Sequence, residues 1–201
     1  MSRRPKLDIS GINKVDAVPL RQALALQQKA IAEIAKAKER QAALEKEVAE
    51  WMENTDPDDA NRIQLISGKK IQVDIMPGLI RRHEITLDRE LTPTLVREAD
   101  RFRGNLRRFY EQASEAVAAQ VAEVLRPYFS IQQHGNGEKR DRALDMARQA
   151  DDCFAISMRI ERVNSIQISD QPRPSFPEAA ARYDSDLAES ATALLMLAEE
   201  A

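Results

Sequence analysis

The segment from Leu91 to Phe129 constrains the fold of this chain more than any other part of the sequence. Thr92 is suited to cap a helix and Pro93 to occupy its first turn, while Pro127 should end it. These signals predict a helix over 93–126, about 50 Å long at ~1.5 Å per residue. An apolar stripe recurs along it in alternating steps of four and three residues, and one such stripe needs partner helices to leave water. The stripe consists of Leu95, Ala99, Phe102, Leu106, Phe109, Ala113 and Ala116.

Two earlier segments can supply the partner helices. Residues 19–54 begin with Pro19 and then contain neither Gly nor Pro, which favours one long helix. Residues 57–90 follow Asp56, which can cap a second helix, and Pro77-Gly78 should kink or break it. Heptad-like spacing is kept by Leu20, Leu24, Ile31, Ile34, Val48 and Met52 in the first segment, and by Ile63, Ile66, Val73, Ile80, Leu87 and Leu91 in the second.

An alternative exists for residues 62–76. Apolar and polar residues alternate at Ile63–Leu65 and Ile71–Ile75, and Ser67–Lys70 could turn between them, which is typical of a β-hairpin. We favour the helix, because the capping signal is strong and the heptad register continues past the proposed turn.

Composition agrees with long exposed helices. The chain has 201 residues, of which 43% are hydrophobic, 31% are charged and only 6 are Gly. We therefore predict an all-α, elongated antiparallel helical bundle, a coiled-coil-like hairpin with two smaller appended helices. The expected organisation is a loosely ordered N-terminal arm (1–18), the bundle (19–165), a proline-rich linker (166–177) and an acidic C-terminal helix (178–201).

The expected compartment is the cytoplasm. Cys153 is the only cysteine, which excludes an intramolecular disulfide and suits a reducing environment. No apolar run is long enough to span a bilayer, so we expect a soluble protein without a membrane partner.

Residues that carry chemistry are sparse. His83, His134 and Cys153 do not stand at metal-ligand spacing from one another. Cys153 falls on the apolar side of an expected helix, and Ser67–Lys70 lacks the spaced glycines of a phosphate loop. The sequence predicts no catalytic, cofactor-binding or metal site, and hence no enzyme.

Arginines gather in residues 81–108, which hold eight of them against five acidic residues. Arginine favours bidentate contacts with phosphate or carboxylate groups. A run of charge is more often a solvated face, and Phe102 and Phe109 belong to the core stripe, which makes them poor candidates for base stacking. The candidate surface for a polyanion or an acidic partner is Arg97, Arg101, Arg103, Arg107 and Arg108.

The C-terminal segment 178–201 is acidic, with six acidic residues against Arg182 alone. Its apolar face is narrow, and we name Leu187, Leu194 and Leu195 as the candidate helix-docking face. We expect this helix to dock on the arginine-bearing face, either in its own chain or in a neighbouring copy.

These features favour a non-catalytic protein–protein interaction or structural protein: a scaffold, an adaptor or a subunit of a larger complex. Its partner would be another protein or a second copy of the chain. The alternative is a nucleic-acid-binding accessory or regulatory protein that uses segment 81–108, and steep salt dependence of binding would reveal it.

Overall fold

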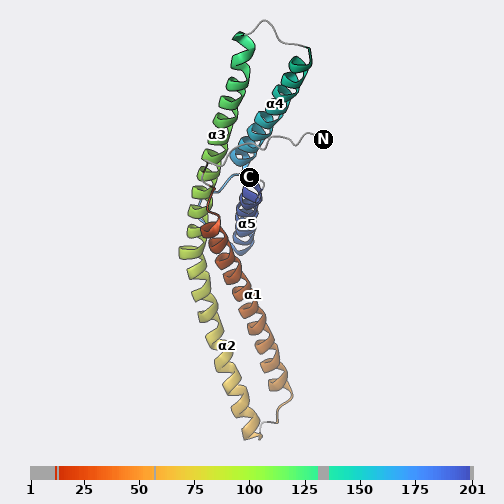
Figure 1. Cartoon of the computed structure of the whole chain (residues 1–201). Coiled ribbons are helices and arrows are strands. Elements are labelled where there is room, and N and C mark those ends of the chain that lie inside the picture. The colour runs from red at the N-terminus through yellow and green to blue at the C-terminus, as the bar shows by residue number, and fades with distance from the viewer. Residues whose placement is uncertain (1–11, 13, 57, 131–135, 200–201) are drawn as a thin grey trace. The chain divides into compact units, whose positions relative to one another are not determined.

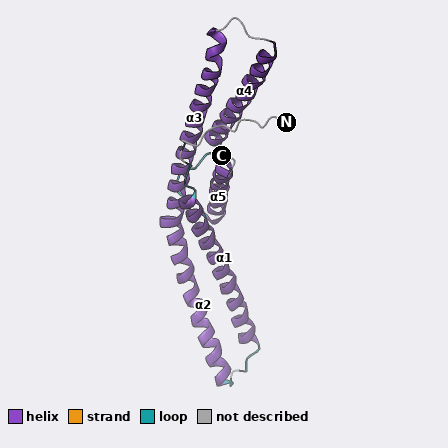
Figure 2. Ribbon diagram, in the orientation of Figure 1, coloured by secondary structure: helices purple, strands orange, loops and turns teal. Residues whose placement is uncertain are grey.

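The computed structural model describes residue 12 and residues 14–56, 58–130 and 136–199, with the side chains at 120–149 outside the description. In chain order the elements are α1 (Val18–Glu53), α2 (Ala60–Thr86), the π-helical turn η1 (Leu87–Leu91), α3 (Thr92–Ser130), α4 (Asn136–Ser165) and α5 (Pro177–Glu199) (Figure 1). The described residues form helices and no strand (Figure 2). The predicted all-α class is therefore confirmed.

The alternative β-hairpin over 62–76 is wrong, because α2 covers that whole segment. Ile66, Met76 and Ile80 are buried on one face of the helix, and this packing overrides the local alternation of apolar and polar residues. The helix also continues through Pro77-Gly78 without a break.

The first turn of α2 differs from the prediction. Asp59, rather than Asp56, caps the helix by accepting a hydrogen bond from Arg62 N at 3.1 Å. Asp56 Oδ1 accepts instead from Asp58 N at 3.1 Å, which closes the turn before the helix. Pro57 lies outside the described residues.

α3 begins at Thr92, as predicted, but the predicted capping role of Thr92 is wrong. No non-helical residue separates α2, η1 and α3, and Thr92 has helical angles, φ −64° and ψ −47°. Its backbone N–H donates to Leu87 O, five residues back, and its hydroxyl has no hydrogen-bond partner among the described residues. Pro93 lacks an N–H and its ring would crowd a carbonyl in a regular α-helix; the wider turn just before it relieves that conflict. At the other end, α3 continues through Pro127 to Ser130.

The chain divides into two compact units. The first unit comprises Met1–Pro19, Glu98–Asp170 and Ser185–Ala201, and the second comprises Leu20–Arg97 and Gln171–Asp184. The predicted bundle (19–165) and the predicted C-terminal helix (178–201) each contribute to both units. Most of the predicted N-terminal arm (1–18) lies outside the described residues.

In the second unit α1 and α2 form an antiparallel hairpin (Figure 1). Lys38 Nζ lies 2.9 Å from Glu84 Oε1, and Lys69 pairs with Glu47. Residues later in α2 therefore pair with residues earlier in α1, as in an antiparallel pair. The apolar cluster between the two helices comprises Ala30, Ile34, Ile80 and Leu87, with Ile31, Ala37 and Leu91 packed against it.

In the first unit α3 and α4 are likewise antiparallel. Arg103 Nη1 donates to Ile166 O at 3.1 Å, and the Arg159 guanidinium lies 5.9 Å from the centroid of the Tyr110 ring. Six of the seven predicted stripe residues along α3 are buried; Ala116 is half-buried, and its neighbour Val117 is buried in its place. The stripe that the spacing predicts is thus the core-facing side of α3.

Across the described residues, no helix combines the length and the apolar character that crossing a membrane requires.

Candidate functional site

Helix α2 carries apolar side chains on two different sides. Ile66, Met76 and Ile80 face the α1 side and are buried. Ile71, Ile75 and Leu79 lie on another side, and their exposed fractions are 59%, 54% and 40%. Because residues four apart are neighbours on a helix surface, these three form one continuous row. We call this row the α2 apolar face.

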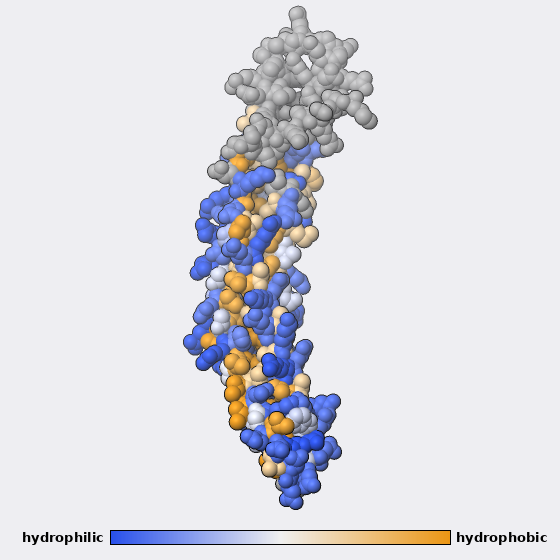
Figure 3. All heavy atoms as spheres, turned by 60° about the horizontal axis from the view of Figure 1, so that its bottom comes forward, coloured by the Kyte–Doolittle hydropathy of each residue, from blue (hydrophilic) through white to orange (hydrophobic). Residues whose placement is uncertain are grey.

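Apolar side chains of α2 are also exposed outside this row. Leu65, near the beginning of α2, is 60% exposed. Figure 3 shows orange apolar atoms interrupting the blue hydrophilic surface on the face in view. Single exposed apolar residues are normal in soluble proteins, whereas larger contiguous apolar patches are typical of binding sites.

Two glycines lie on the same side of α2 as this row. A Cβ atom built on Gly68 or on Gly78 would meet nothing within 4 Å. Glycine in a helix interior is less stable than alanine by about 0.5–1 kcal/mol. Packing within the described chain gives no reason for glycine at either position, so the backbone is left accessible there.

At the end of the α1–α2 hairpin where the chain turns, two cationic side chains of α2 contact Trp51 of α1. Lys69 Nζ lies 4.2 Å from the centroid of the indole ring, and Arg62 Cζ lies 5.9 Å from it. Lys69 also forms an ion pair with Glu47 on α1. Cation–π contacts of this kind contribute about 0.5–1 kcal/mol each at exposed sites. They fix the register of α2 on α1, and hence the orientation of the α2 apolar face.

A polar cluster in the second unit centres on Arg173, which precedes α5. Its Nε and Nη2 donate to the Asp184 carboxylate at 2.9 and 2.7 Å, and its Nη1 donates to Asp88 in η1. The hydrogen bonds to Asp184 raise the pKa of the Arg173 guanidinium; burial opposes this shift, and the charges of Asp184 and Asp88 add to it. Gln27 on α1 is fully buried, and its Nε2 donates a long hydrogen bond of 3.5 Å to Asp184 Oδ1.

This cluster holds the segment before α5 against η1 and α1. A guanidinium that stays protonated cannot act as a general base, so the arrangement suits a structural role rather than proton transfer. Sequence reasoning missed it, since Arg173 and Asp88 are 85 residues apart. The only local signal was an arginine between Pro172 and Pro174 in an otherwise weakly charged segment.

The candidate arginine surface is mostly exposed. In the first unit Arg107 Nε lies 2.8 Å from Glu111 Oε1, and Arg101 lies 4.0 Å from Glu98. Arg103 is half-buried, because it donates to Ile166 O and to Asp100. Arg108 in the first unit and Arg97 in the second are exposed. Four of the five predicted arginines are thus exposed, while Arg103 joins α3 to Ile166, the residue after α4.

The candidate helix-docking face lies on the part of α5 that belongs to the first unit. Leu187 and Leu194 are buried, and Leu195 is half-buried. Leu197 was not named as part of this face; it is buried, and its carbonyl accepts a hydrogen bond from Tyr110 Oη at 2.6 Å. A step of three residues from Leu194 reaches Leu197, which could have been read from the spacing.

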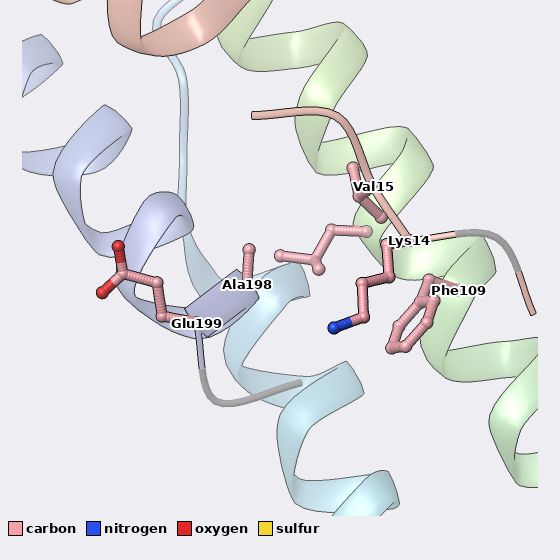
Figure 4. A pocket seen from close by; sticks show the side chains of 6 residues that line it. Lys14, Val15, Phe109, Ala198 and Glu199 are labelled. Atoms are coloured by element: carbon pink, nitrogen blue, oxygen red, sulfur yellow. The ribbon is translucent and has the colours of Figure 1, made fainter. Parts of the chain in front are cut away.

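A cavity of about 210 Å³ opens in the first unit (Figure 4). Figure 4 shows the Lys14 side chain beside the Phe109 ring, while the Glu199 carboxylate points away from the cavity. Both charged side chains are exposed, so neither offers a ligand a desolvated polar contact. The lining residues are Lys14, Val15, Leu106, Phe109, Ala198 and Glu199.

No metal centre forms among the residues that the structure describes, since no group of three or more His, Cys, Asp or Glu side chains is placed to hold an ion. His83 is exposed and His134 lies outside the description. Cys153 is half-buried rather than fully buried, and its neighbour Phe154 is exposed. The predictions of no catalytic residue and no cofactor remain predictions.

Comparison with known proteins gives no assignment: no protein-family model, no curated protein and no solved structure matches this chain.

Proposed function

We propose that this chain is a non-catalytic, cytoplasmic protein–protein interaction or assembly protein, and that its binding surface is the α2 apolar face. The observation that carries the proposal is the exposure of Ile71, Ile75 and Leu79 in one row. The opposite side of the same helix is already packed against α1.

Energetics support a binding role for this row. Fully burying a Leu or Ile side chain contributes about 1.5–3 kcal/mol relative to leaving it exposed. Three such side chains, each about half exposed, provide enough apolar surface for a helix-in-groove or helix-on-helix contact with anchors one turn apart.

The contacts that hold α2 on α1 favour a binding role as well. The ion pair between Lys38 and Glu84 and the contacts of Trp51 with Lys69 hold α2 on α1 along its length. A surface that is ordered before binding loses less conformational entropy when a partner docks.

The test compares two substitutions on the same helix. Ile75→Asp places a charge in the row, whereas Ile63→Asp places the same charge at an apolar residue of similar exposure, 44%, about 120° away around the helix. We expect the wild type and Ile63→Asp to retain the same partner in a quantitative pull-down, and Ile75→Asp to lose it. Far-UV circular dichroism checks that both variants fold. If all three proteins retained the partner equally, the α2 apolar face would not be the binding surface.

The second candidate function is nucleic-acid binding through segment 81–108. Exposed arginines on α3, Arg101 and Arg108 among them, favour it. The burial of Phe102, Phe109 and Tyr110 leaves no aromatic platform there for base stacking. Binding would then rest on phosphate contacts, so affinity for a duplex should fall steeply with salt and should weaken in Arg101→Ala. No retention of a duplex at low salt would exclude this candidate.

A further inference from the structure

We infer that the partner of the α2 apolar face is a second copy of this chain, bound through the same face in antiparallel orientation. This inference rests on the proposed function and names its partner.

The exposed side of α2 carries the spacing of a coiled-coil seam. Positions 64, 68, 71, 75, 78 and 82 follow one another in alternating steps of four and three, and all six residues are exposed. This is the spacing of the a and d positions of a heptad repeat. The residues at these positions, in order, are Gln64, Gly68, Ile71, Ile75, Gly78 and Arg82.

A two-fold axis beside residue 73 pairs these positions with compatible chemistry. Ile71 then lies opposite Ile75 of the second copy, and Gly68 lies opposite Gly78. The Gln64 amide, which can accept a hydrogen bond, lies opposite the Arg82 guanidinium. On one flank Leu65 meets Leu79, so the four most exposed apolar residues of this side of α2 all find apolar partners. A two-fold contact requires such a self-complementary surface.

The parallel alternative is less compatible. It would put Arg82 opposite Arg82 and Gln64 opposite Gln64. Like charges at facing positions oppose association and help to set helix orientation. The antiparallel pair avoids this Arg82 contact and pairs Leu65 with Leu79, and it brings Asp74 beside its own copy on the other flank.

The two glycines supply an independent reason for a close neighbour. Nothing in the described chain lies within 4 Å of a Cβ built at Gly68 or Gly78. In the antiparallel pair these residues face each other at two symmetry-related layers, where the absence of side chains lets the two helix backbones approach. The contact is only one helix wide, so we expect a weak dimer rather than a permanent one.

Cross-linking of the full chain tests the register. In a Cys153→Ser background, Gln64→Cys and Arg82→Cys are made separately and treated with a short bismaleimide, alone and as an equimolar mixture. The antiparallel pair should cross-link in the mixture and in neither single variant, because each position lies about 27 Å along the helix from its own copy. Cross-linking of either variant alone, or of no sample, would overturn the inference.

Glycine variants separate folding from association. Gly68→Ala and Gly78→Ala should raise the melting temperature of the monomer, since the added methyl groups have room within the chain. The same pair of changes should weaken the dimer by about tenfold or more in sedimentation equilibrium, which corresponds to ~1.4 kcal/mol. A double variant that dimerises as well as the wild type would contradict the close helix contact.

Failure of this inference can be told apart from failure of the proposed function. If the wild type stays monomeric up to its solubility limit while Ile75→Asp loses a host protein that Ile63→Asp retains, the second copy is wrong and the α2 apolar face remains a binding surface for another protein. If Ile75→Asp changes neither mass nor capture, both are wrong. If it abolishes the dimer while Ile63→Asp does not, both are supported.

Discussion

Arg173 holds the Asp184 carboxylate from two of its nitrogens, and the same guanidinium donates its third nitrogen to Asp88 in the π turn. The Arg173 side chain is mostly buried, the Asp184 side chain is buried, and Asp88 is partly exposed. The three groups differ in burial, so the two carboxylates should differ in their effect on stability.

Removal of the buried partner should be the more damaging change. Asp184→Ala leaves a guanidinium and the Gln27 amide without their shared acceptor, and we expect a loss of about 3 kcal/mol in the free energy of unfolding. Asp88→Ala removes a partner that is 43% exposed and should cost about 0–1 kcal/mol. Urea denaturation of the two variants measures the difference. Similar losses of unfolding free energy in the two variants would mean that burial of the carboxylate does not decide its contribution to stability.

The contribution of Arg173 should not change with pH on the alkaline side of neutrality. Its folded-state pKa is raised, so its charge stabilises the fold fully at any pH below its unfolded pKa and is lost only as pH rises through the higher folded value. The difference in unfolding free energy between the wild type and Arg173→Met should therefore be the same at pH 7 and at pH 9. A difference that shrinks over this interval would show that another group titrates in the cluster.

Two phenylalanines provide a matched test of the core. Phe102 is buried on the α3 stripe, whereas Phe154 on α4 is 69% exposed. Phe102→Ala should cost about 3–5 kcal/mol, and Phe154→Ala should change stability by under ~0.5 kcal/mol. Thermal and urea denaturation would reveal an error in the buried face if the two changes had equal effects.

Two tyrosine hydroxyls allow the same comparison for a hydrogen bond. Tyr110 is buried and donates to Leu197 O, while Tyr183 donates to Gln171 O at 3.1 Å in an exposed setting. Tyr110→Phe leaves a buried carbonyl without its donor and should cost about 1–3 kcal/mol. Tyr183→Phe should cost less than ~0.5 kcal/mol, because water replaces the hydroxyl. The reverse order would place the end of α5 away from α3.

Trp51 is the only tryptophan, so its fluorescence reports on the end of the α1–α2 hairpin. Lys69→Met removes a cation that lies over the indole and should shift the emission maximum. Lys70→Met, at the exposed neighbouring position, should leave the spectrum unchanged. Identical spectra for the wild type and both variants would argue against the cation–π contact.

The core of α3 was predictable from spacing alone. Phe102 and Leu106 are anchored by a repeat of four and three that runs for six steps, and a long periodic pattern overrides local ambiguity. The all-α class followed from the same periodicity and from the low glycine content. The α2 apolar face is not evident from the sequence, since Ile71 and Ile75 alternate with polar residues, a pattern that is also typical of a strand.

The features that sequence reasoning missed depend on tertiary structure. Thr92 and Pro93 have the local chemistry of a helix start, and only the packing of residues on both sides keeps the helix continuous through them. The link between Arg173 and Asp88 joins residues far apart in sequence, and no local spacing encodes it. In the helix-docking face the spacing predicts Leu195, whereas Leu197 is the more buried residue, because a helical face drifts along mixed steps of three and four.

The π turn also makes the chain sensitive to length at one place. Leu87–Leu91 closes its turn with one residue more than an α-turn uses, and it separates buried Ile80 from buried Leu95. Deleting one residue here would let a regular α-helix run through with Leu95 still in phase with Ile80, whereas inserting one would rotate Leu95 by about 100° and take it off the buried side. Single-residue insertions should therefore be tolerated in the loop before Ala60 and rejected between Leu87 and Leu91, whereas a single deletion between Leu87 and Leu91 should be tolerated better than an insertion.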